Sequence, residues 1–274
     1  MFEAFRVNRG RATGVIQWML NAAWPKMYWQ LYDWYLVPTG AFYATKKACE
    51  PLQLIYSYGD ASIYLVDDRR GAGNGIKAEI RVYDIESRLS LAAYLPVETQ
   101  TGASKRILRL PRLDHITTTY FLSLRLLDAA GARIADNFYW LSTRPDVLDY
   151  EARVTPWEYF TPSRGYADMT MLNSLPPVDV DVTHRLETAG EEDRITVELA
   201  NRGDGIAFFI ELLLTDAATG EPVAPVYWQD NYVSLLPNET RTLTATFPST
   251  GQPSVLTVRG WNVVPRVSGN SITG

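Results

Sequence analysis

From Leu52 onward the chain alternates apolar and polar residues with a period of two, and this pattern most narrows the folds open to it. In residues 76–83, Ile, Ala, Ile and Val occupy every second position. Because successive side chains of a β-strand point to opposite faces, such a run predicts a strand with one buried face. Turn-forming residues separate the runs, at Tyr58–Asp60, Gly71–Gly75 and Asp128–Gly131. The sequence therefore predicts a mainly β protein built of short strands.

The strand-like runs form two blocks. In the first block we expect seven strands, in segments 52–58, 61–67, 76–84, 87–96, 105–110, 119–128 and 133–142. Short strands at this density are typical of an immunoglobulin-like β-sandwich. In the second block we expect strands in segments 178–187, 193–203, 206–216, 223–236, 239–247 and 254–262. This block predicts a second sandwich of similar size.

The first 50 residues do not show the period-two pattern of apolar residues. Residues 14–21 are an almost continuous apolar run, which fits a strand buried on both faces in a parallel sheet or barrel. Residues 26–36 and 41–50 have helical spacing, so we expect a βα unit with one extra helix. Residues 2–7 resemble the end of a helix already in progress. We therefore expect Met1 to correspond to an internal position of a longer protein.

These patterns predict four regions. They are a βα segment over 1–50, a sandwich over 51–144, a linker over 145–177 and a C-terminal sandwich over 178–274. The linker is predicted from five prolines and little periodicity. The patterns thus predict a mainly β fold, with two immunoglobulin-like sandwiches preceded by a βα unit.

Composition excludes several functions. The formal net charge of −5 argues against a nucleic-acid partner, which favours basic surfaces. The single cysteine, Cys49, excludes an intrachain disulfide and a cysteine-rich zinc site, and two histidines leave little for a metal cluster. We expect no metal and no cofactor. No apolar run reaches about 18 residues, so we expect no membrane span, and the first residues have no signal-peptide pattern.

Several motifs have a simple structural interpretation. Gly71–Gly75 looks like a phosphate loop, but a strand follows it where a nucleotide-binding fingerprint requires a helix. We expect His115 and His184, in different blocks, to be ordinary strand or surface residues, and Cys49 to be inert. Asn238-Glu239-Thr240 is a glycosylation sequon and contains an Asn-Glu pair, but its setting favours a turn between strands.

The aromatic residues near the start raise a functional question. Trp18 and Asn21 fall at the end of the expected strand over 14–21. Barrel enzymes build their sites at that edge of the sheet. Aromatic faces pack against sugar rings, and amides bind sugar hydroxyls, although aromatic residues serve more often in protein cores. Both a sugar-binding role and a packing role therefore stay open for Trp18.

Several segments together resemble a known family. The stretches over 14–36 and 40–52, NFYWLS at 137–142, AFFIEL at 207–212 and residues 226–243 resemble family 2 glycoside hydrolases. The branch is similar to exo-β-D-glucosaminidases and the related plant-type endo-β-mannosidases. The last stretch departs from the family at Asn238, where glycine is usual. The resemblance covers most of the chain and implies that residues 1–50 are the terminal βα segment of a (β/α)8 barrel. The expected fold class is then mainly β, with two immunoglobulin-like sandwiches preceded by the last βα unit of a TIM barrel.

The resemblance also implies a catalytic mechanism, and it implies which part of the enzyme carries the catalytic residues. Family 2 enzymes are retaining glycosidases with two catalytic glutamates about 5–5.5 Å apart. In the family both glutamates precede the region that this chain matches. We therefore nominate no catalytic residue; the acids considered and set aside are Glu3, Glu50, Glu79, Glu151 and Glu158. Trp18 matches an aromatic wall of the sugar subsite and Asn21 a polar residue beside it, while Trp24, Pro25 and Trp29 are assigned to barrel packing.

The expected function is that of the C-terminal part of a retaining exo-β-glycosidase of the β-glucosaminidase or β-mannosidase type. Its expected partners are an oligosaccharide or polysaccharide substrate and the remaining catalytic barrel. The alternative is a non-catalytic carbohydrate-binding or structural sandwich module. The resemblance suggests a secreted or periplasmic parent protein, although the sequence itself carries no signal for a compartment.

Overall fold

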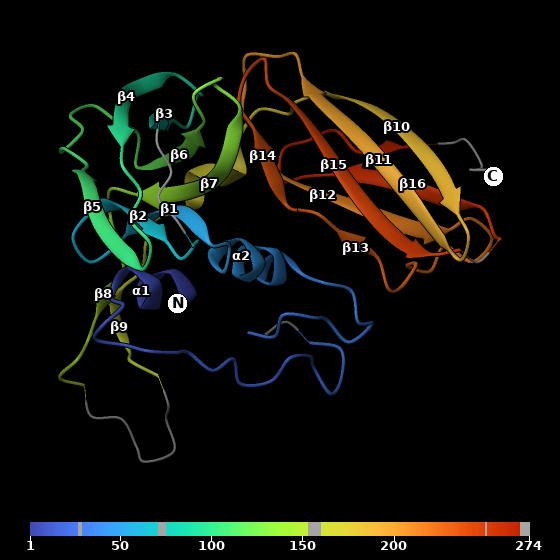
Figure 1. The fold of residues 1–274 in the computed structure, drawn as a ribbon, viewed down its shortest axis with the longest axis horizontal. Coiled ribbons are helices and arrows are strands. Elements are labelled where there is room, and N and C mark those ends of the chain that lie inside the picture. Colours follow the sequence, from blue (N-terminus) through green and yellow to red (C-terminus); the bar gives the residue numbers. More distant parts are fainter. Residues whose placement is uncertain (27–28, 71–74, 153–159, 250, 269–274) are drawn as a thin grey trace. The chain divides into compact units, whose positions relative to one another are not determined.

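The computed structural model describes residues 1–26, 29–70, 75–152, 160–249 and 251–268 (Figure 1). It contains two compact units, each with its own β-sandwich. The first unit joins residues 3–13 to residues 50–175, and the second joins residues 14–49 to the chain from Pro176 onward. Among the described residues, no helix has the length and apolar character needed to cross a lipid bilayer.

The first sandwich follows the alternating pattern of its sequence. Its strands are β1 (Leu52–Ser57), β2 (Ser62–Asp67), β3 (Ile76–Asp84), β4 (Leu89–Val97), β5 (Ala103–Arg109), β6 (Thr119–Leu127) and β7 (Arg133–Ser142). They form antiparallel sheets with orders β1-β2-β5 and β4-β3-β6-β7. Ile80 on β3 and Leu124 on β6 are fully buried, and they share one core with Ile63 on β2. The seven strands predicted in this block are confirmed.

The described residues between β7 and β10 contain only short regular elements. A short antiparallel ribbon pairs β8 (Val147–Leu148) with β9 (Ser163–Gly165). A 3-10 helix, η1 (Thr170–Ser174), follows it. Thr119 of β6 donates from Oγ1 to the carbonyl oxygen of Asp168 at 3.0 Å, which ties this region to the first sandwich.

The second sandwich has the same two-sheet plan. Its strands are β10 (Val180–Ala189), β11 (Glu192–Asn201), β12 (Ala207–Asp216), β13 (Tyr227–Trp228), β14 (Val233–Leu235), β15 (Thr240–Pro248), β16 (Ser254–Arg259) and β17 (Arg266–Val267). The sheet orders are β10-β11-β15-β13 and β14-β12-β16-β17. Along β11, Ile195, Val197 and Leu199 are fully buried, as their alternation with Thr196 and Glu198 predicts.

Left-handed backbone occurs at non-glycine residues of this sandwich, including Phe209 and Asn238. Phe209 has a φ of +57° where the pairing of β12 with β14 shifts register between Ala207 and Ile210. Asn238 has a φ of +59° in the turn before β15. Left-handed backbone favours glycine and, after it, asparagine. This explains how asparagine can occupy the position where the resembling family carries glycine, and it confirms the predicted turn.

The first 50 residues depart from the expected βα unit. Helix α1 (Phe2–Val7) and helix α2 (Gly40–Ala48) are present, close to the helices predicted at residues 2–7 and 41–50. Between Gly14 and Thr39, however, the described residues form neither the expected strand over 14–21 nor the expected helix over 26–36. A strand of a parallel sheet needs neighbouring strands for its backbone hydrogen bonds. No such neighbour for residues 14–21 occurs in the part of the chain that the structure describes.

Candidate functional site

Residues 14–39, called the aromatic segment below, contain the two candidate sugar contacts. The segment folds back on itself, because the Nε1 of Trp29 donates to the carbonyl oxygen of Trp18 at 3.0 Å. The amide of Gln17 donates to the carbonyl oxygen of Trp29 at 3.1 Å. A few residues on, the N–H groups of Leu31 and Tyr32 both donate to the carbonyl oxygen of Leu20 at 3.0 Å. Trp18 and Asn21 thus lie on the same arm of one folded-back loop.

The side chains of this loop mostly face solvent. Trp18 is 72% exposed, and the Nδ2 of Asn21 donates to the carbonyl oxygen of the adjacent Ala22 at 3.3 Å. Trp24 and Trp29, which the resemblance assigns to packing of the barrel, are both exposed in this chain. The remaining exposed apolar side chains of the segment are Ile16, Met19, Leu20, Trp34, Tyr35 and Leu36. Large apolar side chains are thus exposed repeatedly within one short segment.

Helix α2 joins the aromatic segment to the second sandwich. Tyr43 is buried in the core of that sandwich, and Cα of Gly40 packs so close to the ring of Phe209 that a Cβ would lie 2.9 Å from it. At the other end of the helix, Nζ of Lys46 donates to the carbonyl oxygens of Trp228 and Gln229 at 2.9 Å each. The helix is therefore held at both ends.

An ion-pair cluster completes this attachment. Oδ2 of Asp230 accepts from Lys47 at 2.8 Å and from Arg241 at 2.5 Å. Arg241 is buried, and the other two side chains are partly buried. Hydrogen bonds between charged groups are stronger than neutral ones, and removing one partner of a buried pair leaves an uncompensated charge. The sequence analysis missed this cluster, because nothing in the sequence pairs Lys47 with a residue so far along the chain.

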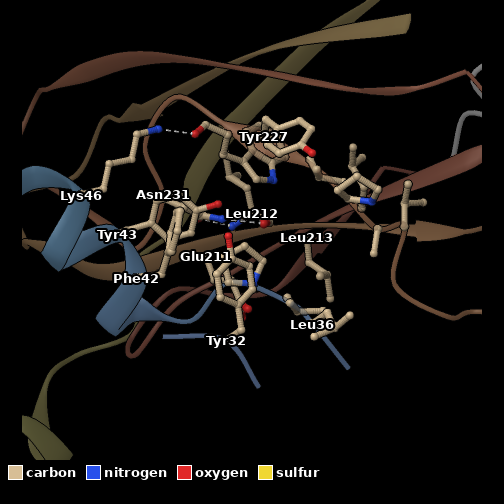
Figure 2. A pocket seen from close by; sticks show the side chains of 18 residues that line it. Tyr32, Leu36, Phe42, Tyr43, Lys46, Glu211, Leu212, Leu213, Tyr227 and Asn231 are labelled. Atoms are coloured by element: carbon tan, nitrogen blue, oxygen red, sulfur yellow. Dashed lines mark hydrogen bonds between the residues drawn. The ribbon is translucent and has the colours of Figure 1, made fainter. Parts of the chain in front are cut away.

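A small cavity of about 100 Å³ lies beside α2 (Figure 2). Its walls are mostly apolar, with Phe42 and Tyr43 from the helix and Leu212–Leu214 from β12. The polar groups at its edge already have partners: Glu211 accepts from Tyr232 at 2.8 Å and from Arg259 at 2.5 Å. Burial raises the pKa of Tyr43 well above its usual range, so this phenol stays protonated. The cavity offers no free acid or base for catalysis.

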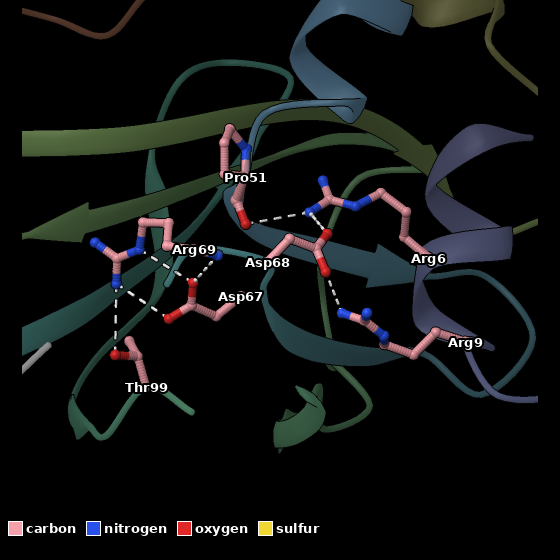
Figure 3. A network of polar contacts seen from close by, with 7 residues as sticks. All are labelled: Arg6, Arg9, Pro51, Asp67, Asp68, Arg69 and Thr99. Carbon is pink, nitrogen blue, oxygen red and sulfur yellow. Dashed lines mark hydrogen bonds and ion pairs between the residues drawn. The ribbon is translucent and has the colours of Figure 1, made fainter. Parts of the chain in front are cut away.

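A polar network holds α1 to the first sandwich (Figure 3). Arg6 forms an ion pair with Asp68 at 2.9 Å, and Arg9 pairs with the same carboxylate. Glu3 is half-buried, and its Oε1 accepts from Nδ2 of Asn137 at 2.5 Å and from the hydroxyl of Tyr139 at 2.8 Å. Loss of solvent around the carboxylate raises the pKa of Glu3, although both hydrogen bonds act in the opposite direction.

The other acids set aside in the sequence also have structural partners. Glu50 accepts from Gln53 at 2.8 Å, Glu79 pairs with Arg81 at 2.8 Å, and the exposed Glu151 lies 3.3 Å from Arg164. Glu158 lies outside the described residues. No group of three or more potential metal ligands occurs in the ranges that the structure describes.

The cysteine, the histidines and the glycine-rich loop singled out in the sequence lie in ordinary structural positions. Cys49 is an exposed free thiol directly after α2, and His115 lies in a loop with a φ of +69°. Nε2 of His184, on β10, lies 3.2 Å from Oγ of Ser268. The loop Gly71–Gly75 lies outside the described residues except for Gly75, whose φ is +74°.

Comparison with known proteins adds what the geometry alone does not show. The sequence model of the exo-β-D-glucosaminidase Ig-fold domain matches residues 158–263. The chain is 40% identical over 262 residues to the exo-β-D-glucosaminidase of Streptomyces avermitilis, covering 92% of this chain and 28% of that protein. It is 35% identical over 263 residues to that of Amycolatopsis orientalis, covering 92% of this chain and 25% of the relative.

Similarity in structure agrees with similarity in sequence. The crystal structure of the exo-chitosanase CsxA of Amycolatopsis orientalis superposes with a TM-score of 0.87 and 33% identity, covering 94% of this chain and 31% of CsxA. A mannosylglycoprotein endo-β-mannosidase of Lilium longiflorum is 24% identical over 295 residues. The chain spans about 28% of the length of the Streptomyces avermitilis enzyme. It belongs to the exo-β-D-glucosaminidase family of glycoside hydrolases, to which it corresponds as a C-terminal part.

Proposed function

We propose that this chain is the C-terminal part of a retaining exo-β-glycosidase that removes a terminal β-linked glucosamine or mannose residue. The observation that carries the proposal is the 40% identity to the Streptomyces avermitilis exo-β-D-glucosaminidase across 92% of the chain. In this function the two catalytic glutamates belong to the remaining part of the enzyme. This chain contributes one wall of the sugar site and two sandwiches that support the barrel.

The regions then have separate roles. Residues 1–50 contribute the last βα unit of the (β/α)8 barrel, and residues 51–144 and 178–274 form accessory sandwiches joined through residues 145–177. The exposed apolar face of the aromatic segment supports the first of these assignments, because such a surface becomes stable when it is covered. Supplied with neighbouring strands, residues 14–21 would exchange their loop hydrogen bonds for those of a sheet.

In the sugar site, Trp18 offers a flat aromatic face and Asn21 an amide. The exposed indole of Trp18 supports this role, because C–H bonds of a pyranose pack against such a face. The amide of Asn21 would exchange its local hydrogen bond to Ala22 for one to a sugar hydroxyl.

A chimera tests the proposal directly. The part of the Streptomyces avermitilis enzyme that matches this chain is replaced by this chain, and hydrolysis of p-nitrophenyl β-D-glucosaminide is measured. We expect an active chimera in which Trp18→Ala lowers kcat/KM by about tenfold or more, equivalent to about 1.4 kcal/mol of transition-state stabilisation. Tyr150→Ala, at an exposed aromatic residue outside the segment, is the control and should leave kcat/KM unchanged.

Two measurements on the chain by itself complete the test. We expect no turnover of the same substrate, and turnover that disappears on mutation of a glutamate within the chain would contradict the proposal. A folded but inactive chimera would contradict it as well. Saturable binding of chitosan oligosaccharides that survives deletion of residues 1–50 would instead support a carbohydrate-binding module.

A further inference from the structure

Thr39, the N-cap residue of α2, makes an unusual use of its hydroxyl group. A threonine at this position ordinarily accepts a hydrogen bond from the first turn of its own helix. Here the side chain makes no such bond. Instead, its Oγ1 donates to the carbonyl oxygen of Leu31 at 2.9 Å, and its N–H donates to the same oxygen at 3.0 Å. Two donors on one carbonyl join the start of the helix to the aromatic segment.

From this point we propose that Thr39 and Asp230 are positioning residues for Trp18. They would hold the indole through one continuous set of contacts that begins in the second sandwich. The proposal rests on the proposed function of Trp18 in the sugar site, and it adds the residues that fix its place. Neither residue needs to touch the substrate.

The first step of the set is the anchor at Asp230. This residue lies in the loop between β13 and β14, and its carboxylate binds Lys47 of α2 on one side and Arg241 of β15 on the other. Lys46, the preceding residue of the helix, binds the carbonyl oxygens of Trp228 and Gln229, the two residues before Asp230. Positive charges near a helix C-terminus are also favoured by the helix dipole. This end of α2 is therefore fixed to the sandwich by charge.

The second step is the helix itself, which has little freedom to turn or slide. Aromatic rings of the helix contact both neighbours. The ring centroid of Tyr43 lies 6.0 Å from that of Tyr232 in the sandwich, and the ring centroid of Phe42 lies 5.1 Å from that of Tyr32 in the aromatic segment. The Cα of Gly40 packs against Phe209. A rigid element held in this way transmits the position of one end to the other.

The third step runs from Thr39 to Trp18. The carbonyl of Leu31 binds both donors of Thr39, and the N–H of the same residue binds the carbonyl oxygen of Leu20. On the same pair of arms, Trp29 donates to the carbonyl oxygen of Trp18. The exposed indole of Trp18 is thus held by its backbone, through an arm that the hydrogen bonds of Thr39 and the ring contact between Phe42 and Tyr32 join to the helix. A displacement of about 1 Å in such a contact can cost a large factor in rate.

Fluorine NMR of the chain labelled with 5-fluorotryptophan tests the set of contacts without any substrate. The Trp18 resonance is assigned by Trp18→Phe and followed in Thr39→Val, which keeps the N–H but removes the hydroxyl, and in Asp230→Asn. We expect the Trp18 resonance to shift or broaden in both variants, with unchanged circular dichroism. Matched controls are Thr242→Val, at an exposed position of β15, and Asp181→Asn, in an exposed ion pair with Arg202.

An unmoved Trp18 resonance in Thr39→Val would overturn the proposal. If Asp230→Asn unfolds the chain, Thr39→Val decides alone, because it removes a single hydroxyl group. In the chimera, Thr39→Val should raise KM about three- to tenfold, as expected for loss of about one hydrogen bond. It should add nothing in the Trp18→Ala background, whereas an independent structural effect would add in full. Because the NMR measurement needs no sugar, an inactive chimera with a shifted resonance would refute the proposed function alone.

Discussion

The aromatic segment is more apolar in sequence than strand β11, yet its apolar side chains are exposed and those of β11 are buried. On β11, Leu199 is 0% exposed, whereas Ile16 and Leu20 of the segment are 86% and 58% exposed. The difference lies in the backbone. β11 pairs with β10 on one side and with β15 on the other, so its backbone polar groups are satisfied as its side chains are buried. The segment pairs mainly with itself, through isolated contacts such as the bridge between Asn21 and Tyr32.

This comparison teaches that an apolar pattern predicts burial only where the chain also supplies the neighbours. The hydrophobic effect favours covering both regions. Only the second sandwich provides, in the same chain, a second sheet and adjacent strands with matching register. The apolar side chains of the segment named above stay exposed in the structure.

The largest effect is expected when the same substitution, leucine to alanine, is made once in β11 and once in the aromatic segment. Leu199→Ala should lower the free energy of unfolding of the second sandwich by about 2–5 kcal/mol, because it opens a cavity in a closed core. Leu20→Ala should change it by less than about 0.5 kcal/mol, because the side chain is already in solvent. Urea unfolding followed by circular dichroism measures both. Equal losses would show that the segment is packed in solution.

A smaller effect is expected from adding a single methyl group. A Cβ at Gly260 would lie 2.9 Å from Cγ2 of Val263 and 3.0 Å from the carbonyl oxygen of Phe208, so Gly260→Ala should cost about 1–3 kcal/mol. At Gly14 a Cβ meets no atom within 4 Å, and Gly14→Ala should be close to neutral. Thermal unfolding of the two variants compares them. A neutral Gly260→Ala would mean that this edge of the sandwich yields easily.

The smallest expected effect is on the pH dependence of the stability of the first unit. It arises at α1, which is attached to the first sandwich partly through the desolvated carboxylate of Glu3. Because the pKa of Glu3 is raised in the folded state, the protonated form is favoured there. Its contribution to stability is full below the unfolded pKa and declines as the pH rises through the folded pKa. Glu3→Gln should therefore remove this decline and stabilise the first unit at neutral pH by up to about 1 kcal/mol.

Unfolding midpoints of the parent chain and Glu3→Gln, measured between pH 4 and pH 8, test this prediction. Glu86→Gln, in an exposed ion pair with Arg88, is the control. A Glu3→Gln variant that is less stable than the parent at neutral pH would show that the hydrogen bonds from Asn137 and Tyr139 outweigh the desolvation.

Local pattern was sufficient for much of the fold. The alternation along β3 and β11 predicted strands that the structure contains, and the Pro-Asn turn at Asn238 was predicted from its setting. It was insufficient for the expected strand over 14–21, because a two-sided buried strand is defined by its neighbours. The hydrogen bond from Thr39 to Leu31 could not be predicted from the sequence either, because a threonine before a helix is expected to cap that helix.

The sequence by itself predicted the two sandwiches and most of their strands, because period-two burial and turn residues are local properties, while the family followed from the resemblance of particular segments. It also placed Trp18 and Asn21 on one short segment. Only the tertiary structure decided that Asp230, far along the chain, anchors α2, and that the half-buried Glu3 accepts a hydrogen bond from Tyr139. Ion pairs and desolvation depend on which distant residues meet, and that is a property of the folded chain alone.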